Sequence, residues 1–240
     1  MVFPDKATDQ RRVKWITHYN SSQRILLVGE GDFSFSACLA KAFGSASNMV
    51  ATSLDSEATL LWKHWTSTAH LQELEELQCL ILHEVDVNDM HEHETLKNMK
   101  FDRIIFNFPH AGHDPFYKER DKELIMRHRE LLEAFFKSAS KMLSEGGQVH
   151  VTHRNDYPYK RWKLEKLAKK AGLVLVEMVE VIKAAYPGYH NKRGGGIKSN
   201  KKFPWTDESF TFKFSLPESS QDDDGLAMSL SSSLLSMQFN

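Results

Sequence analysis

The stretch Val-Gly-Glu-Gly-Asp-Phe-Ser-Phe-Ser at residues 28–36 decides the fold of this 240-residue chain. Before it, residues 24–28 include a run of apolar, mostly branched side chains, which is typical of a buried parallel strand. After it, apolar side chains recur three and four positions apart from Phe35 to Phe43, and Gly44 ends the pattern as a helix C-cap would. The stretch therefore predicts a strand, a tight glycine turn and a helix.

The rest of the chain continues this alternation of strands and helices. The predicted strands are at residues 49–54, 79–83, 103–108, 148–152, 173–182 and 210–214, and the predicted helices are at 57–78, 119–143 and 160–171. Strands that alternate with helices predict a parallel sheet with right-handed crossovers. No helical pattern separates the last two strands, which predicts a closing antiparallel strand. A closing antiparallel strand of this kind is typical of Rossmann-like methyltransferases and is absent from most dehydrogenase domains. The expected fold class is therefore α/β: a Rossmann-like methyltransferase fold, with a mostly parallel seven-stranded sheet and helices on both faces.

Composition divides the chain into three parts. Residues 1–22 are an N-terminal extension, residues 23–216 are the folded domain, and residues 217–240 are a predicted disordered tail with seven serines and three consecutive aspartates. No apolar run approaches the roughly 18 residues that cross a bilayer, and the first residues lack the apolar core of a secretory signal. We therefore expect no membrane partner and an intracellular protein of the nucleolus, nucleus or cytoplasm.

The glycine turn predicts the class of cofactor. Gly29 permits a sharp turn and Gly31 lets a ligand approach the backbone, while the helix behind them presents free N–H groups. Asp55 follows the second strand, where an acid accepts both hydroxyls of a ribose. Glu30 and Asp32 would repel a pyrophosphate but suit a ligand that carries an ammonium and a sulfonium cation. S-adenosylmethionine is such a ligand and is the expected cofactor.

A dinucleotide remains the alternative ligand of this turn. The dinucleotide fingerprint has a small residue three positions after Gly31, and Ser34 stands there between two phenylalanines. An NAD-dependent oxidoreductase would use the same glycine turn and Asp55. The two carboxylates of the turn favour S-adenosylmethionine over NAD.

Two later segments fit a methyltransferase site. Asp86 and Val87 follow the third strand, where an acid and an apolar side chain would contact adenine. Residues 107–110, Asn-Phe-Pro-His, end the fourth strand and resemble the Asn-Pro-Pro-aromatic motif of amino-group methyltransferases. Ligands of open α/β sheets bind beyond the carboxyl ends of the strands, which is where this motif falls. The candidate catalytic residues are Asn107, Pro109 and His110.

Basic charge is concentrated near the C-terminal end of the domain. Between residues 154 and 202 there are thirteen Lys or Arg against four acidic residues, although the whole chain has a net charge of −1. Aromatic residues lie between these cations, a pattern that suits single-stranded or looped RNA. We expect Lys166, Lys169 and Lys170 to be solvated, and residues 194–199 to form a flexible flap. The candidate substrate-binding residues are His113, His153, Arg154, Tyr157, Tyr189, Lys192 and Arg193.

Four motifs together resemble the family of large-subunit (25S) ribosomal RNA (uracil-N3)-methyltransferases. They are Gly-Glu-Gly-Asp-Phe-Ser-Phe-Ser at 29–36, Phe-Asn-Phe-Pro-His-Ala-Gly at 106–112, Val-His-Val-Thr-His at 149–153 and Tyr-Pro-Gly-Tyr-His-Asn-Lys-Arg-Gly at 186–194. The resemblance covers residues 24–215 and implies methylation of uridine N3 in RNA. It also implies that residues 107–110 face the base. Together with the turn analysis, it gives as cofactor-binding residues Gly29, Glu30, Gly31, Asp32, Phe33, Ser34, Asp55, Asp86 and Val87.

Methylation at uracil N3 requires loss of a proton, so we expect a base or oxyanion-stabilising donors nearby. His110 is the first candidate base, followed by His113 and His153. Cys38 and Cys79 lie far apart and match no metal spacing, and the histidines between residues 83 and 93 lack cysteine partners, so no metal is expected. A catalytically inactive RNA-binding paralogue is the remaining alternative, because such families can lose their substrate.

Overall fold

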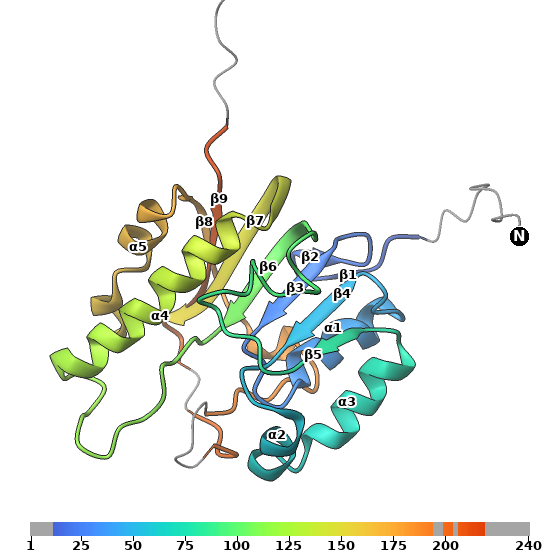
Figure 1. The fold of residues 1–240 in the computed structure, drawn as a ribbon, viewed down its shortest axis with the longest axis horizontal. Coiled ribbons are helices and arrows are strands. Elements are labelled where there is room, and N and C mark those ends of the chain that lie inside the picture. The colour runs from blue at the N-terminus through green and yellow to red at the C-terminus, as the bar shows by residue number, and fades with distance from the viewer. Residues whose placement is uncertain (1–11, 194–198, 204–205, 219–240) are drawn as a thin grey trace, which may run out of the picture.

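The computed structural model of the protein describes residues 12–193, 199–203 and 206–218. Figure 1 shows a twisted sheet with helices packed on either side of it. The elements are, in chain order, β1 (Trp15–Ile16), β2 (Tyr19–Asn20), β3 (Ile25–Val28), α1 (Ser34–Phe43), β4 (Met49–Thr52), α2 (Glu57–Lys63), α3 (Ser67–Glu76), β5 (Leu80–Leu82), β6 (Phe101–Asn107), α4 (Lys122–Ser140), β7 (Leu143–Arg154), the 3-10 turn η1 (Tyr159–Trp162), α5 (Leu164–Lys170), β8 (Val174–Glu180), the 3-10 turn η2 (Lys183–Ala185) and β9 (Ser209–Ser215).

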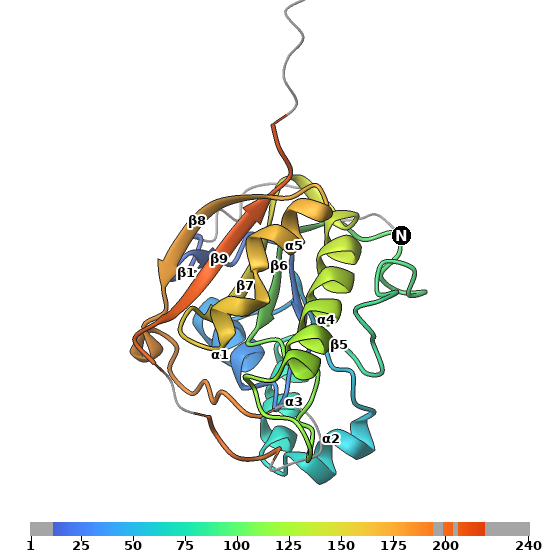
Figure 2. The ribbon, with the colours of Figure 1, turned by 90° about the vertical axis from the view of Figure 1, so that its left-hand side faces the viewer.

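The sheet has seven strands in the order β5-β4-β3-β6-β7-β9-β8. Neighbouring strands from β5 to β7 are parallel, whereas β9 lies between β7 and β8 and is antiparallel to both. Figure 2 shows β8 and β9 side by side at this end of the sheet. The strand order reverses between β3 and β6, and open α/β sheets bind their ligands beyond the carboxyl ends of the strands at such a point. The predicted fold class is confirmed.

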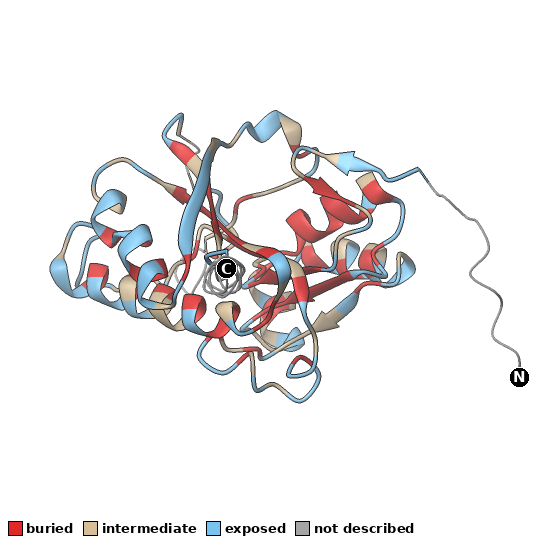
Figure 3. Ribbon diagram, turned by 90° about the horizontal axis from the view of Figure 1, so that it is seen from above, coloured by how far each residue is buried: buried red, intermediate tan, exposed pale blue. Residues whose placement is uncertain are grey.

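Alternate residues of β3 enter two separate hydrophobic cores, because successive side chains of a strand point to opposite faces. Leu26 and Val28 pack in the core that α4 and α5 cover. Ile25 and Leu27 pack in the core that α1 and α3 cover. Figure 3 shows the buried residues along the sheet and on the helix faces that contact it. The central strand is thus buried on both sides, as its continuous apolar sequence predicts.

A short hairpin, β1–β2, precedes the sheet and packs on its α1 side. Tyr19 is only 1% exposed, and its ring meets Phe35 edge-on at 6.2 Å between centroids. The Tyr19 hydroxyl lies 3.1 Å from Nδ1 of His150 on β7. The hairpin falls within residues 1–22, so residues 12–22 of the predicted extension contribute side chains to the folded core.

The predicted helix at 57–78 is wrong as a single element, because the structure breaks it into α2 and α3. The Ser67 hydroxyl donates to the carbonyl of His64 at 2.6 Å in the turn between them. Leu60, His64 and Leu71 are buried and are spaced by multiples of the helical repeat across this turn. Because the break preserves the phase of the buried face, apolar periodicity could not reveal it.

The predicted helix at 160–171 is likewise two elements. Residues 159–162 form η1, and Lys163 adopts a left-handed conformation with φ +61° before α5 begins. The left-handed residue redirects the chain so that Trp162 is buried beside the sheet, at 1% exposure. The remaining predicted helices and strands are present with shifted ends.

Some sequence predictions lie outside the described residues. These are residues 194–198 of the proposed flap, residues 219–240 of the tail and residues 1–11 of the extension. Within the part of the chain that the structure describes, no helix combines the length and apolar character needed to span a membrane.

Candidate active site

A crevice of about 360 Å³ opens at the carboxyl ends of β3, β4 and β6. It contains eight of the nine predicted cofactor-binding residues, together with Asn107 and His110. Phe33 is the exception. It is fully buried, its φ of +58° turns the side chain away from the crevice, and its ring lies 5.9 Å from that of His83. Phe35, two positions later, lines the crevice.

The two turn glycines have different physical roles. Gly29 has a φ of +65°, and a Cβ added there would lie 2.5 Å from the Phe106 ring, which no real contact permits. A Cβ added to Gly31 would lie 3.6 Å from Cβ of Lys192, an ordinary contact. Gly29 is therefore required by the fold, whereas Gly31 keeps the crevice open for a ligand.

Glu30 supports the start of α1. Its carboxylate accepts hydrogen bonds from the backbone N–H of Ser36 at 3.1 Å and from the Ser36 hydroxyl at 2.8 Å. Burial raises the pKa of Glu30 to about 7. The side chain lines the crevice, but the same carboxylate oxygen accepts both hydrogen bonds from Ser36.

Asp32 keeps one carboxylate oxygen without a hydrogen bond. Oδ1 accepts from the backbone N–H of Ser34 at 3.1 Å, as in an Asx turn. Oδ2 is buried and has no hydrogen-bond partner among the described residues, and Nζ of Lys192 lies 3.8 Å away. Asp32 is therefore the acid of the turn that can meet a cationic ligand.

Asp55 and Asp86, which were predicted to contact ribose and adenine, both line the crevice. Oδ1 of Asp55 is 2.6 Å from Nζ of Lys63 on α2, which holds the carboxylate at the crevice wall. Oδ1 of Asp86 accepts from the backbone N–H of Asn88 at 2.9 Å. Val87 is 6% exposed and supplies an apolar contact beside them.

Asn107 ends β6 with an unused donor. Its Nδ2 is buried and has no acceptor among the described residues, although buried amide groups are nearly always hydrogen-bonded. The residue pairs with Thr152 across the β6–β7 ladder, which fixes its backbone at the rim of the sheet. The Asn107 amide is therefore positioned to donate to a ligand in the crevice.

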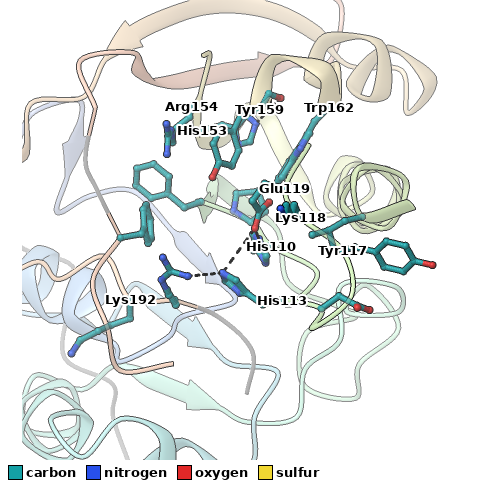
Figure 4. Close-up of a pocket in the computed structure, with 16 residues that line it drawn as sticks. His110, His113, Tyr117, Lys118, Glu119, His153, Arg154, Tyr159, Trp162 and Lys192 are labelled. Atoms are coloured by element: carbon teal, nitrogen blue, oxygen red, sulfur yellow. Dashed lines mark hydrogen bonds and ion pairs between the residues drawn. The ribbon is translucent and has the colours of Figure 1, made fainter. Parts of the chain in front are cut away.

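A second pocket of about 340 Å³ adjoins the crevice (Figure 4). The two cavities share four lining residues, namely Phe108, His110, Lys192 and Phe203. Pro109, Tyr159 and Trp162 give the second pocket an apolar wall. Lys118, Arg154, Lys192 and Arg193 give it a basic one. Its size and aromatic lining suit a nucleobase, so it is called the base pocket below.

Both ring nitrogens of His110 are already hydrogen-bonded. Nδ1 accepts from the backbone N–H of Gly112 at 3.1 Å, and Nε2 lies 2.9 Å from Oε1 of Glu119. His128, from α4, lies against the same carboxylate, with Nε2 3.4 Å from Oε2. In this arrangement His110 forms a wall between the two cavities, and neither nitrogen is available to take a proton from a substrate.

Five of the seven predicted substrate-binding residues line the base pocket. Arg193 lies 3.0 Å from Nε2 of His113, and the Arg154 guanidinium stacks 4.3 Å above the Tyr159 ring. Burial lowers the pKa of His153 to about 4, so this ring is neutral. The five are His113, His153, Arg154, Lys192 and Arg193.

The two remaining residues, Tyr157 and Tyr189, lie elsewhere. Tyr157 is 58% exposed and lines neither cavity. Tyr189 lines the crevice, with its ring 5.1 Å from that of Phe35. Tyr189 is therefore placed on the cofactor side rather than the substrate side.

Sequence reasoning missed Glu119 and His128. Glu119 lies in the loop before α4, and His128 is fully buried, with its ring stacked on Trp162 at 4.1 Å. His128 shares the buried face of α4 with Leu124 and Leu132. The position of His128 on an otherwise apolar face of the predicted helix could have indicated a polar partner, because a buried polar ring needs hydrogen-bond partners.

Comparison with known proteins identifies the family. The family model described as rRNA (uridine-N3-)-methyltransferase BTM5-like matches residues 26–193. "Uncharacterized protein At4g26485" of Arabidopsis thaliana is 46% identical, over 84% of this chain and 96% of that protein. "Heavy metal-associated isoprenylated plant protein 41" of the same plant is 48% identical, over 83% of this chain but only 38% of its own length.

Two further similarities are more distant. The 25S rRNA (uridine(2634)-N(3))-methyltransferase of Saccharomyces cerevisiae is 26% identical, over 77% of this chain and 70% of that protein. The crystal structure of an S-adenosylmethionine-dependent methyltransferase from Clostridium acetobutylicum aligns with 80% of this chain and 83% of its own, with a TM-score of 0.48 and 15% identity. On the strength of the family model and the plant relatives, this chain belongs to the family described as rRNA (uridine-N3-)-methyltransferase BTM5-like.

Proposed function

We propose that the protein methylates N3 of a uridine in RNA, with large-subunit ribosomal RNA as the substrate. The observation that carries the proposal is the wall of four residues shared by a cofactor crevice and a base pocket. Methyl transfer is a direct displacement, which requires the nucleophile, the methyl group and the sulfur to be aligned in a site closed to water. Adjoining cavities that meet at one wall provide that alignment.

The chain's own residues fit the cofactor and the reaction. S-adenosylmethionine, when bound, supplies the methyl group as an alkylating sulfonium. Oδ2 of Asp32 suits its cationic part, and Asp55 suits its ribose. Loss of the N3 proton leaves negative charge on the uracil oxygens. Lys192 lines both cavities, and Asn107 lines the crevice next to Phe108 of the shared wall, so their ammonium and amide groups are donors that would stabilise it. Positioning and charge stabilisation are the protein's two contributions.

An RNA substrate is supported by the charge and shape of the base pocket. Four cationic side chains line it, and Tyr159 offers aromatic surface for stacking an unpaired base. A uridine buried among these residues must be splayed out of its helix or come from a loop. A ribosomal RNA substrate also fits the proposed location in the nucleolus, nucleus or cytoplasm.

The test is transfer of labelled methyl groups from S-adenosylmethionine to total RNA, followed by nucleoside analysis. The expected product is 3-methyluridine. Asn107→Ala should lower its formation by roughly 100-fold, the scale measured when one oxyanion donor is removed. The matched control is Asn48→Ala, because Asn48 is exposed, lines neither cavity and donates from its amide to the Ser21 carbonyl. Label in another nucleoside, or in protein alone, would contradict the proposal.

Two alternative functions give different results in binding experiments. An NAD-dependent oxidoreductase would bind NAD in preference to S-adenosylmethionine, which calorimetry with both ligands decides. A catalytically inactive RNA-binding paralogue would bind S-adenosylmethionine yet transfer no methyl group to any RNA.

A further inference from the structure

Two histidines at the wall of the base pocket share a single carboxylate. Nε2 of His110 is 2.9 Å from Oε1 of Glu119, and Nε2 of His128 is 3.4 Å from Oε2. The His110 and His128 rings also contact each other, with centroids 4.3 Å apart. Figure 4 shows Glu119 beside His110 in the middle of the pocket. One anionic group thus faces both rings at once.

Backbone amides determine which nitrogen of each ring carries the proton. The N–H of Gly112 donates to Nδ1 of His110, and the N–H of Ala111 donates to Nδ1 of His128, each at 3.1 Å. A ring nitrogen that accepts a hydrogen bond cannot itself carry a proton. The proton of each neutral ring is therefore on Nε2, the nitrogen that faces the carboxylate.

The electrostatics agree with this assignment. Burial alone would raise the pKa of Glu119, but the Nε2–H groups of His110 and His128 that face the carboxylate outweigh it and hold the pKa well below its usual value. Burial lowers the pKa of His128, whose side chain is fully buried. Glu119 is accordingly a carboxylate, and Nε2 of the neutral His128 lies 3.4 Å from its Oε2, although neither atom has a hydrogen-bond partner among the described residues.

The same atoms raise the question of a metal ion. One ligand atom each from His110, His113 and Glu119 lies within 4.8 Å of the others. A metal-bound histidine ordinarily donates its second ring N–H to an acceptor. Here the second nitrogen of His110 receives an N–H instead, and so does that of His128. Metal binding through Nε2 of His110 would require this ring to give up its backbone hydrogen bond.

We propose that Glu119 is a positioning residue, which fixes His110 and His128 as neutral Nε2–H rings and thereby sets the wall between the cofactor crevice and the base pocket. The catalytic part of this inference rests on the proposed methyl transfer to RNA. His110 lines both cavities, so a tilt of its ring would shift the base relative to the methyl group. Glu119 acts through the two rings and need not touch the reacting atoms.

The protonation pattern can be measured in the wild-type protein without any substrate. Long-range ¹H–¹⁵N correlation spectra distinguish the two histidine tautomers, and His110→Gln and His128→Gln variants assign the signals. Both rings are expected to be protonated on Nε2 alone at pH 7. A proton on Nδ1 of either ring, or a shift of both signals on addition of one equivalent of zinc chloride, would overturn the proposal.

Kinetics of Glu119→Gln test the consequence for the reaction. Glutamine offers one acceptor oxygen and one donating amide, so one Nε2–H loses its acceptor. We expect kcat for RNA methylation to fall about 10- to 100-fold, because displacements of about an ångström can cost that much. The Kd for S-adenosylmethionine should not change, and Glu119→Asp should recover part of kcat because it keeps the charge.

Glu92→Gln is the matched control. Oε1 of Glu92 lies 3.3 Å from Nε2 of His91, but this carboxylate is 74% exposed and neither residue lines the pockets. The Glu92→Gln variant should leave kcat unchanged. Wild-type kcat in Glu119→Gln, or a loss confined to cofactor affinity, would refute the positioning role. Should wild-type protein methylate no RNA at all, the proposed function fails, and the spectra still decide the tautomers.

Discussion

At residue 30 a buried carboxyl group lines the crevice and accepts hydrogen bonds from Ser36. Its pKa rises from 4.5 to about 7 because of burial, so the folded protein holds this proton more tightly than the unfolded chain does. The stability contributed by the neutral form is therefore complete below pH 4.5 and is lost as the pH rises through about 7. Ionised Glu30 is a destabilising feature above neutrality.

Glu30→Gln should remove this pH dependence. The glutamine oxygen can still accept from Ser36, and it never ionises. The free energy of unfolding of the variant, minus that of wild type, should rise by on the order of 3 kcal/mol between pH 4.5 and 8. Urea denaturation of both proteins across this range measures it. A difference that stays constant with pH would contradict the assigned burial effect.

The glycines of the turn should respond differently to alanine. Gly29→Ala places a Cβ against Phe106 at a positive φ, and it should cost about 1–3 kcal/mol of unfolding free energy. Gly31→Ala should remain within about 0.5 kcal/mol of wild type, because its Cβ meets only ordinary contacts. Chemical denaturation measures both variants, and equal losses would refute the distinction.

The larger change Gly31→Arg tests the crevice itself. An arginine side chain would fill the space between the turn and Lys192, so it should abolish binding of S-adenosylmethionine while the protein stays folded. Calorimetry measures the affinity, and circular dichroism verifies the fold. An unchanged Kd would count against the cofactor site proposed for this crevice.

Single residues show what sequence reasoning could and could not reach. The glycine turn with Asp55 and Asn107 was predictable, since parallel strands deliver their carboxyl ends to one edge of the sheet. Phe33 was predicted to line the crevice, but its left-handed backbone turns the ring into the core. Glu119 was missed because its role depends on His128, and nine positions in sequence do not show that the two side chains meet.

Among the elements, the β1–β2 hairpin was not predicted from the sequence. Two-residue strands carry no detectable periodicity, so only tertiary packing reveals them. The break between α2 and α3 was not predicted for the opposite reason. The buried residues on both sides of the turn keep the spacing of one continuous helix. Long elements such as α4, with 19 residues and a continuous apolar stripe, were predictable.

The hairpin should contribute to stability through Tyr19. Tyr19→Ala removes a ring that is 1% exposed, and it should cost about 3–5 kcal/mol of unfolding free energy. Trp15→Ala, in the partner strand, removes a side chain that is 62% exposed and should cost no more than about 0.5 kcal/mol. Urea denaturation compares the two. A Tyr19→Ala protein as stable as wild type would show that the hairpin is dispensable.

For the whole molecule, the positions of the charged residues matter more for RNA binding than the net charge does. The chain is nearly neutral, yet Lys160 and Arg161 stand exposed on η1, between Tyr159 and Trp162 of the base pocket. Lys166 and Lys169 are also exposed but lie on α5, whose residues line neither cavity. The two pairs of residues carry equal charge, but only Lys160 and Arg161 lie next to residues that line the proposed RNA site.

RNA affinity should therefore depend on the first set and not on the second. Each phosphate contact releases counterions, so the dependence of log Kd on log salt measures how many contacts form. The double variant Lys160→Gln/Arg161→Gln should weaken binding of a uridine-containing RNA loop and reduce that slope by about 2. Lys166→Gln/Lys169→Gln removes the same charge and should leave the slope unchanged. Equal slopes for the two variants would mean that RNA binding depends on the overall charge and not on Lys160 and Arg161. This result would contradict the proposal that RNA binds at the base pocket.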